Sequence, residues 1–114
     1  MIPSPVVDDL ELNMYRIVWE YDVRPDQVAQ FEQVYGPEGL WIKLFRNSPD
    51  HVATELYRNT KKANRFVTVD SWRSRALYES FRKSHAAEYA HLDEWCERIV
   101  EHERTLGVTD DGKD

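Results

Sequence analysis

Three side chains of this sequence have the chemistry of a general base: the imidazoles of His51 and His85 and the carboxylate of Asp70. A general base takes a proton from a bound substrate, and both kinds of group do so when their surroundings bring their pKa near neutrality. By strand alternation Asp70 shares a face with Trp72, and burial beside such an apolar wall would raise its pKa. The ordinary alternatives are an ion pair or a rim charge for Asp70 and solvent-facing positions for the two histidines.

Aromatic side chains of the predicted strands could line a pocket for a flat molecule. Indole rings supply apolar walls, and tyrosine hydroxyls supply polar contacts at the edge of such a pocket. The candidates are Trp19, Tyr21, Tyr57 and Trp72. The alternative is that the same rings pack in the core and against a partner chain, which is the more common use of large aromatic residues.

The pattern closest to a metal site is Glu88-x-x-His91, which places a carboxylate and an imidazole one helical turn apart. A di-iron bundle needs two such pairs and two further glutamates on facing helices, whereas this sequence offers one pair. The four glycines, at positions 36, 39, 107 and 112, form no phosphate-binding loop. We therefore predict no metal and no cofactor, and we interpret the pair as part of a solvated helix face.

These side chains must be positioned by a few short elements. Alternating apolar residues predict strands at 14–23, 51–58 and 65–72, with a polar connection at 59–64. Residues 98–108 fit either a continued helix or a short fourth strand.

Residues between and after these strands predict helices. Pro25 and Asp26 favour a helix start, which Gly36 and Gly39 interrupt before a second half-helix begins at residue 40. A serine precedes each of two further helical patterns and can cap it. These are Ser74 before 75–83 and Ser84 before 85–97.

The composition is that of a soluble single-domain protein. The 114 residues carry a formal net charge of −6, so we expect no nucleic-acid partner. No apolar run is long enough to cross a membrane. The single cysteine, Cys96, cannot form an internal disulfide, which is typical of a cytoplasmic protein, and its helical neighbours predict a buried position. We divide the chain into a flexible arm (1–13), one folded domain (14–108) and a disordered tail (109–114).

The order of elements predicts the fold. Strand, helix, strand, strand, helix, strand is the order of the α+β ferredoxin-like fold, a split βαβ arrangement whose antiparallel sheet is covered by helices on one face. Val18 in the first strand and Val67 and Val69 in the third lie on the face opposite to the large aromatic residues. A sheet with one wet face should alternate more cleanly. We therefore expect a homodimer in which this second face packs against another copy.

Three segments carry a resemblance to a known family. "YRIVWEYDVRPDQVAQFEQVYG", "SPDHVATELYR" and "RFVTVDSWRSRALYESFRKSHAAEYAHLD" resemble the antibiotic-biosynthesis-monooxygenase-like group of dimeric α+β barrels, over about residues 14–107. The strongest feature is Trp72 at the end of an alternating strand, followed by Tyr78 and Phe81 on a helix. The resemblance implies a homodimer whose two sheets form a shared barrel, with a cleft between sheet and helices in each protomer.

The same group includes oxygenases of aromatic polyketides that need no metal or flavin, and also haem-degrading oxygenases. In the haem-degrading members the haem-ligating histidine lies 19 residues after the tryptophan, as His91 lies after Trp72. Those members have a second tryptophan where this chain has Phe81, and an asparagine where it has Trp19. This chain therefore differs from them at two of the three catalytic positions. Phe81 and His91 remain ligand-binding candidates through this resemblance.

The sequence thus favours a cofactor-independent monooxygenase that acts on a small aromatic or polyketide-like compound. The alternative is a small-molecule-binding or accessory dimer without turnover, and haem degradation is a more distant third. A cavity with a histidine or a carboxylate in its wall would favour the enzyme. A cleft filled by the chain's own aromatic rings would favour the binding protein.

Overall fold

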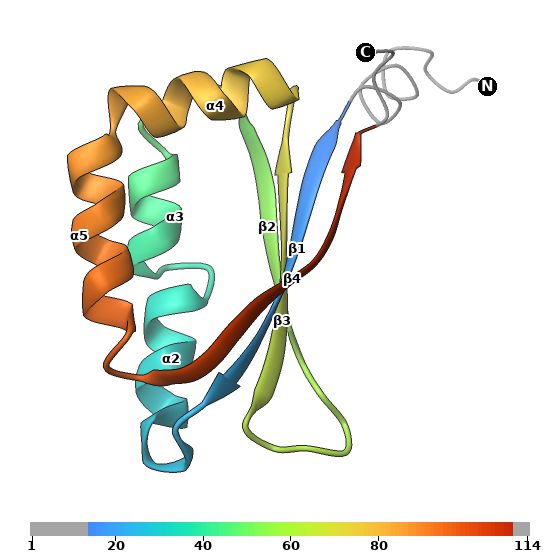
Figure 1. The fold of residues 1–114 in the computed structure, drawn as a ribbon, viewed down its shortest axis with the longest axis vertical. Coiled ribbons are helices and arrows are strands. Elements are labelled where there is room, and N and C mark those ends of the chain that lie inside the picture. The colour runs from blue at the N-terminus through green and yellow to red at the C-terminus, as the bar shows by residue number, and fades with distance from the viewer. Residues whose placement is uncertain (1–13, 111–114) are drawn as a thin grey trace.

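The computed structural model describes residues 14–110 (Figure 1). The predicted arm, 1–13, and residues 111–114 of the predicted tail lie outside the described residues. The elements in chain order are β1 (Tyr15–Val23), the 3-10 turn η1 (Pro25–Gln27), α2 (Val28–Tyr35), α3 (Leu40–Phe45), β2 (His51–Arg58), β3 (Arg65–Trp72), α4 (Arg75–Ser84), α5 (Ala86–Cys96) and β4 (Val100–Asp110).

The four strands form one antiparallel sheet in the order β2-β3-β1-β4. With the helices this is the α+β, ferredoxin-like arrangement, and the predicted fold class is confirmed. Of the two interpretations of residues 98–108 the strand is right, because β4 pairs with β1 along its length. The strand also includes Thr109 and Asp110, two positions past the boundary that the sequence predicted.

The helices lie on one face of the sheet, and none of the helices within residues 14–110 covers the other (Figure 1). α4 crosses one end of the sheet and α5 turns away from it, running beside α3. Ser74 caps α4 as predicted, since its Oγ accepts the backbone N–H of Leu77 at 3.1 Å. The predicted cap at Ser84 is wrong: α4 continues through Ser84, so its backbone is helical, whereas an N-cap residue needs an extended backbone.

The break between α2 and α3 depends on glycine. A Cβ atom at Gly39 would collide with the backbone carbonyl oxygen of Val34, and one at Gly36 would lie 2.5 Å from that of Glu32. The two short helices therefore meet more closely than any larger residue would allow. This brings Tyr35, at the end of α2, and Trp41, in α3, into ring contact at 6.1 Å between centroids.

One part of the core is a group of rings that we call the aromatic cluster: Phe45, His51, Trp72, Tyr78 and Phe81. Trp72 stands at its centre with no exposed surface. Its indole lies 5.0–5.3 Å, between ring centroids, from the other four rings. Cys96 is also buried, as predicted.

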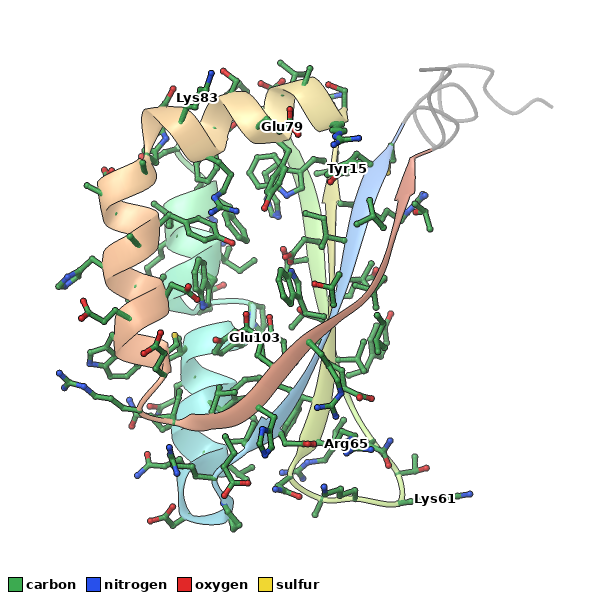
Figure 2. The ribbon with its side chains drawn as sticks, viewed as in Figure 1. Tyr15, Lys61, Arg65, Glu79, Lys83 and Glu103 are labelled. Carbon is green, nitrogen blue, oxygen red and sulfur yellow. The ribbon has the colours of Figure 1, made fainter. Side chains whose placement is uncertain are left out.

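The sheet face without helices has an apolar centre and a charged end. Val18, Val67 and Val69 are half-buried there, and Val18 is the β-pair partner of Val69. Towards one end, Asp22 accepts hydrogen bonds from Arg65 at 2.8 Å and Arg104 at 3.2 Å. These guanidinium groups, Arg65 first, hold the pKa of Asp22 well below its usual range. Figure 2 shows Arg65 near this end of the sheet.

Among the described residues, no helix is both long enough and apolar enough to span a membrane.

Candidate active site

A cavity of about 130 Å³ lies between the inner sheet face and the helices. Every strand and every α-helix contributes to its wall. It is lined by Trp19, Tyr21, Tyr35, Trp41, Phe45, Thr54, Thr68, Asp70, Arg82, Tyr89, Asp93 and Glu103. Figure 2 shows Glu103 on β4, in the space between that strand and the helices.

Strand register sets the polar part of the wall. In the antiparallel pairing of β2 with β3, Thr54 stands opposite Asp70, and on the other side of β3 Asp70 faces Ile17 of β1. Two residues along, Thr68 stands opposite Trp19. Because alternate residues point to the same face, Thr68 and Asp70 both reach the cavity from β3.

A β-bulge brings a histidine to the same face. His51 and Thr54 are three residues apart, and strict alternation would send their side chains to opposite faces. The pairing of β2 with β3 shifts register between His51 and Ala53, which is the signature of a bulge with one extra residue. His51 consequently pairs with Trp72, and its Nε2 lies 2.8 Å from Thr54 Oγ1.

Asp70 is the carboxylate that β3 contributes to the cavity wall. Its Oδ1 accepts a hydrogen bond from Thr54 Oγ1 at 3.0 Å. Burial raises the pKa of Asp70 to about 6, and the Thr54 hydrogen bond opposes that rise only in part. No salt bridge to Asp70 occurs among residues 14–110. A carboxyl group with a pKa near neutrality can both take up and return a proton.

His51 is held neutral. Its ring packs against Phe45 at 4.9 Å and Trp72 at 5.1 Å between centroids. Burial lowers the pKa of His51 to about 4. The imidazole is not among the residues that line the cavity and stands behind Thr54 in the hydrogen-bond chain.

The helix wall supplies rings and hydrogen-bond donors. Tyr35 and Trp41 are buried, and within the described chain neither the Tyr35 hydroxyl nor Trp41 Nε1 makes a hydrogen bond, although both interact electrostatically with the Cys96 thiol. Across the cavity, the Tyr21 hydroxyl lies 3.3 Å from Thr68 Oγ1. Burial raises the pKa of both tyrosines, so both phenols keep their protons at neutral pH.

The remaining charged groups make the wall acidic. Asp93 of α5 and Glu103 of β4 line it together with Asp70, against the single cation Arg82. The Arg82 guanidinium contacts two tyrosines. It donates to the Tyr78 hydroxyl at 3.0 Å and lies 3.8 Å from the centroid of the Tyr89 ring. Partial burial, together with the negative charges of Asp93 and Glu97, raises the pKa of Glu103.

The candidates from the sequence separate into three groups. Trp19, Tyr21 and Asp70 line the cavity. His51, Trp72 and Phe81 belong to the aromatic cluster behind its wall, and His85 stacks on Phe81 at 4.7 Å between centroids.

Tyr57 and His91 lie elsewhere. Tyr57 is exposed on the sheet face without helices, where its hydroxyl donates to Glu55. His91 is exposed and lines a separate groove with Leu40 and Trp95. Within residues 14–110, no group of three or more His, Cys, Asp and Glu side chains is arranged to hold a metal ion.

Several cavity residues were not candidates from the sequence. Thr54 could have been found only by assuming the register of β2 on β3, because nothing in "HVATELYR" singles it out. Arg82 and Tyr89 sit on helices whose rotation about their axes the sequence does not fix. Tyr35 appears in the helical pattern as an ordinary core position.

The comparisons with known proteins agree with this architecture. The sequence model of the family described as antibiotic biosynthesis monooxygenase matches residues 14–93. No curated protein matches the chain at a significant level.

Solved structures share the fold at low identity. SnoaB, a cofactor-independent oxygenase from Streptomyces nogalater, is 16% identical, with a TM-score of 0.70 over 90% of this chain and 96% of its own. A conserved protein from Methanosarcina mazei is 9% identical, with a TM-score of 0.70 over 90% and 97%. A conserved protein of unknown function from Bacteroides thetaiotaomicron is 11% identical, with a TM-score of 0.64 over 86% and 97%. At these identities the likeness shows the fold alone.

Proposed function

The chain belongs to the antibiotic biosynthesis monooxygenase family, and we propose that it oxygenates a small phenolic compound with dioxygen, using Asp70 as general base and no bound metal or flavin. The observation that carries the proposal is the position of Asp70, a carboxylate with a pKa raised to about 6 in the wall of an aromatic-lined cavity. The likeness in fold to SnoaB, which is described as a cofactor-independent oxygenase, supports the reaction type.

The reaction needs a base that can accept and return a proton. For a phenol with an open ring position, Asp70 takes the hydroxyl proton, and the electron-rich anion reacts with dioxygen to form a carbon–oxygen bond. Asp70 returns this proton to the peroxide. It then removes the ring proton as the O–O bond breaks, and the departing hydroxide takes that proton and leaves as water. Phenol and dioxygen thus become quinone and water, and the substrate supplies every electron.

The surrounding groups suit the anion that this step creates. The phenol protons of Tyr21, Tyr35 and Tyr89 are retained at neutral pH, because burial raises the pKa of each. Preorganised O–H and N–H donors stabilise developing negative charge better than mobile water does. The Tyr35 hydroxyl and Trp41 Nε1 make no hydrogen bond within the described part of the chain, and both are available to a bound oxygen atom.

Cavity volume limits the substrate. A dry cavity of about 150 Å³ accepts benzene, and this cavity measures about 130 Å³. A single aromatic ring is therefore about the largest group that this cavity can enclose, and any further rings of a polyketide-like compound would have to lie outside it. We expect single-ring phenols to be the smallest sufficient substrates.

The test is oxygen uptake by the purified protein, whose metal and flavin content is first measured by elemental analysis and absorbance. Substituted phenols, hydroxynaphthoquinones and anthrones form a series of one, two and three rings. With ¹⁸O₂, one labelled oxygen should enter the product. The rate should rise with pH through about 6, where Asp70 ionises. A stoichiometric metal or flavin in active protein would overturn the cofactor-free reaction.

Two variants separate the base from its surroundings. Asp70→Asn keeps the size and the acceptor oxygen for Thr54 but removes the base, and we expect a loss of about 10²- to 10⁴-fold in kcat. Asp93→Asn removes another carboxylate of the same wall and is the matched control, for which we expect a change of less than about tenfold. Equal losses in both variants would contradict the assignment of Asp70.

The alternative is a binding protein without turnover. The aromatic rings that crowd the cavity favour it, because they leave room for little more than one ring. Saturable quenching of tryptophan fluorescence by the ring series, without oxygen uptake for any member, would assign the protein to this class.

We further propose that the protein is a cytoplasmic homodimer. The half-buried Val18, Val67 and Val69 on the sheet face without helices support the dimer, and the one buried cysteine is compatible with a reducing compartment. Light scattering should give about twice the 13.5 kDa chain mass. A monomer at micromolar concentration would contradict the proposal.

A further inference from the structure

The hydroxyl of Thr54 links two titratable groups on the inner sheet face, His51 and Asp70. It lies 2.8 Å from His51 Nε2 and 3.0 Å from Asp70 Oδ1. The cross-strand pairing of Thr54 with Asp70 fixes the second contact, and the bulge after His51 fixes the first. The three groups thus form one hydrogen-bond chain that runs from the aromatic cluster to the cavity.

A threonine hydroxyl has one proton to donate, so it can serve only one of its two neighbours. An ionised carboxylate is an acceptor only, and a hydrogen bond to a charged oxygen is about twice as strong as one between neutral groups. The Thr54 proton therefore goes to Asp70. The short contact to His51 is then a hydrogen bond only if the imidazole donates from Nε2.

We infer that His51 is a positioning residue: by donating from Nε2 to Thr54, it turns the Thr54 hydroxyl proton towards Asp70 and holds the carboxylate oriented for proton transfer. With Oδ1 tied to Thr54, Oδ2 is the oxygen that receives the substrate proton. The catalytic meaning of this role rests on the proposed function, but the direction of the hydrogen bonds does not. His51 thus acts through Thr54 and is not itself the base.

In the competing arrangement, the proton of the His51 imidazole is on Nδ1 and not on Nε2. The His51 imidazole also interacts with the backbone of Ala53, and a neutral imidazole carries one proton. If Nδ1 carried it, Nε2 would accept the Thr54 proton, and ionised Asp70 would be left without its donor. Leaving a buried carboxylate without a donor is costlier than leaving one imidazole nitrogen unpaired, which favours the proton on Nε2.

Other titratable groups also surround Asp70 and are kept constant in the test. They come from the two strands and three helices that complete the cavity wall around it. They are Tyr21 of β1, Tyr35 of α2, Arg82 of α4, Tyr89 and Asp93 of α5, and Glu103 of β4.

The first experiment needs no substrate. Long-range ¹H–¹⁵N spectra of the intact protein report which imidazole nitrogen of His51 carries the proton. We expect the Nε2–H tautomer at pH 7.5, where Asp70 is ionised. An Nδ1–H tautomer would overturn the inference whatever the activity.

The second experiment measures the pKa of Asp70 from its ¹³C carboxyl shift in matched variants. Thr54→Val removes the hydroxyl at nearly constant shape and should raise the pKa of Asp70 by about one unit, whereas Thr54→Ser should restore it. His51→Phe should raise it by less, and His51→Gln, which keeps a donor, should restore it. In the Thr54→Val background, His51→Phe should change nothing further. Additive shifts would show that His51 does not act through Thr54.

Activity distinguishes the two proposals. If the spectra agree with the inference but Asp70→Asn retains full oxygen uptake, the choice of base fails and the hydrogen-bond direction stands. If Asp70→Asn is inactive and Thr54→Val moves the acid limb of the pH–rate profile to higher pH, both stand. An unmoved acid limb in Thr54→Val would refute the positioning role. Circular dichroism of each variant confirms that it is folded.

Discussion

The pKa values of Asp70 and His51 shift in opposite directions on folding, and their effects on the pH dependence of the free energy of unfolding should largely cancel. Burial raises the pKa of Asp70 from 3.8 to about 6 and lowers that of His51 from 6.5 to about 4. The folded state therefore holds a proton on Asp70 that the unfolded chain loses between about pH 4 and 6. Over almost the same range, His51 is unprotonated in the folded state but protonated in the unfolded chain. Stability follows the difference in bound protons.

The two contributions have opposite signs. As the pH rises from 4 to 6, Asp70 ionises in the unfolded chain but not in the folded state. This destabilises the fold by about 3 kcal/mol, which is the equivalent of two pKa units. Over the same rise, loss of the His51 proton from the unfolded chain stabilises the fold. Because the His51 ring is partly exposed, solvent screening reduces this contribution to about 2 kcal/mol. The wild-type profile should accordingly change by only about 1 kcal/mol.

Single variants should reveal each slope. In Asp70→Asn, the contribution of His51 is no longer offset and should raise the free energy of unfolding by about 2 kcal/mol from pH 4 to 6.5. In His51→Phe, the contribution of Asp70 is no longer offset and should lower it by about 3 kcal/mol from pH 4 to 6. Urea unfolding followed by tryptophan fluorescence, at one protein concentration for all samples, measures both. Profiles parallel to the wild type in both variants would refute burial as the cause of these shifts.

Three further predictions concern packing. Trp72→Ala should cost about 3–5 kcal/mol in urea unfolding, because the indole is fully buried, whereas the exposed Leu77→Ala should cost less than about 0.5; a small loss at Trp72 would refute its central place in the core. Gly39→Ala should cost about 1–3 kcal/mol, since its Cβ would meet backbone, and Gly107→Ala, where a Cβ meets nothing within 4 Å, is the control; equal melting temperatures would contradict the close approach. Val69→Lys should shift the light-scattering mass from dimer to monomer, and an unchanged dimer would place the interface elsewhere.

Most of the fold follows from the sequence because its strands and helices have clear periods. Trp72 illustrates this: alternation from Phe66 predicts its face, and the structure buries it completely. The failures are local. Ser84 has the right chemistry for a cap, but the bend between α4 and α5 falls one residue later, at His85. Residues 100–110 become a strand because β1 offers a free edge, which is a tertiary cause.

The site was harder to predict than the fold. Asp70 could be predicted to face the apolar side of its strand. That it forms no ion pair with another described residue could not be predicted, because this depends on which way Arg58 and Arg65 point. Arg65 turns to Asp22 on the other sheet face, and Arg58 approaches Glu32 at 3.9 Å. Thr54 carries no signal of its own, and His51 reaches its place only through an irregularity that period-two reasoning cannot foresee.

The bulge in β2 also has a meaning for the divergence of such chains. The extra residue works as a phase shift: deleting Val52 would remove the bulge and leave His51 two residues before Thr54, a spacing that keeps both side chains on one face of a regular strand. A homologous chain with a spacing of two would therefore need no bulge to bring the imidazole to the threonine, whereas a spacing of three needs one. For homologous chains, the spacing between these two positions is therefore as informative as their chemical identity.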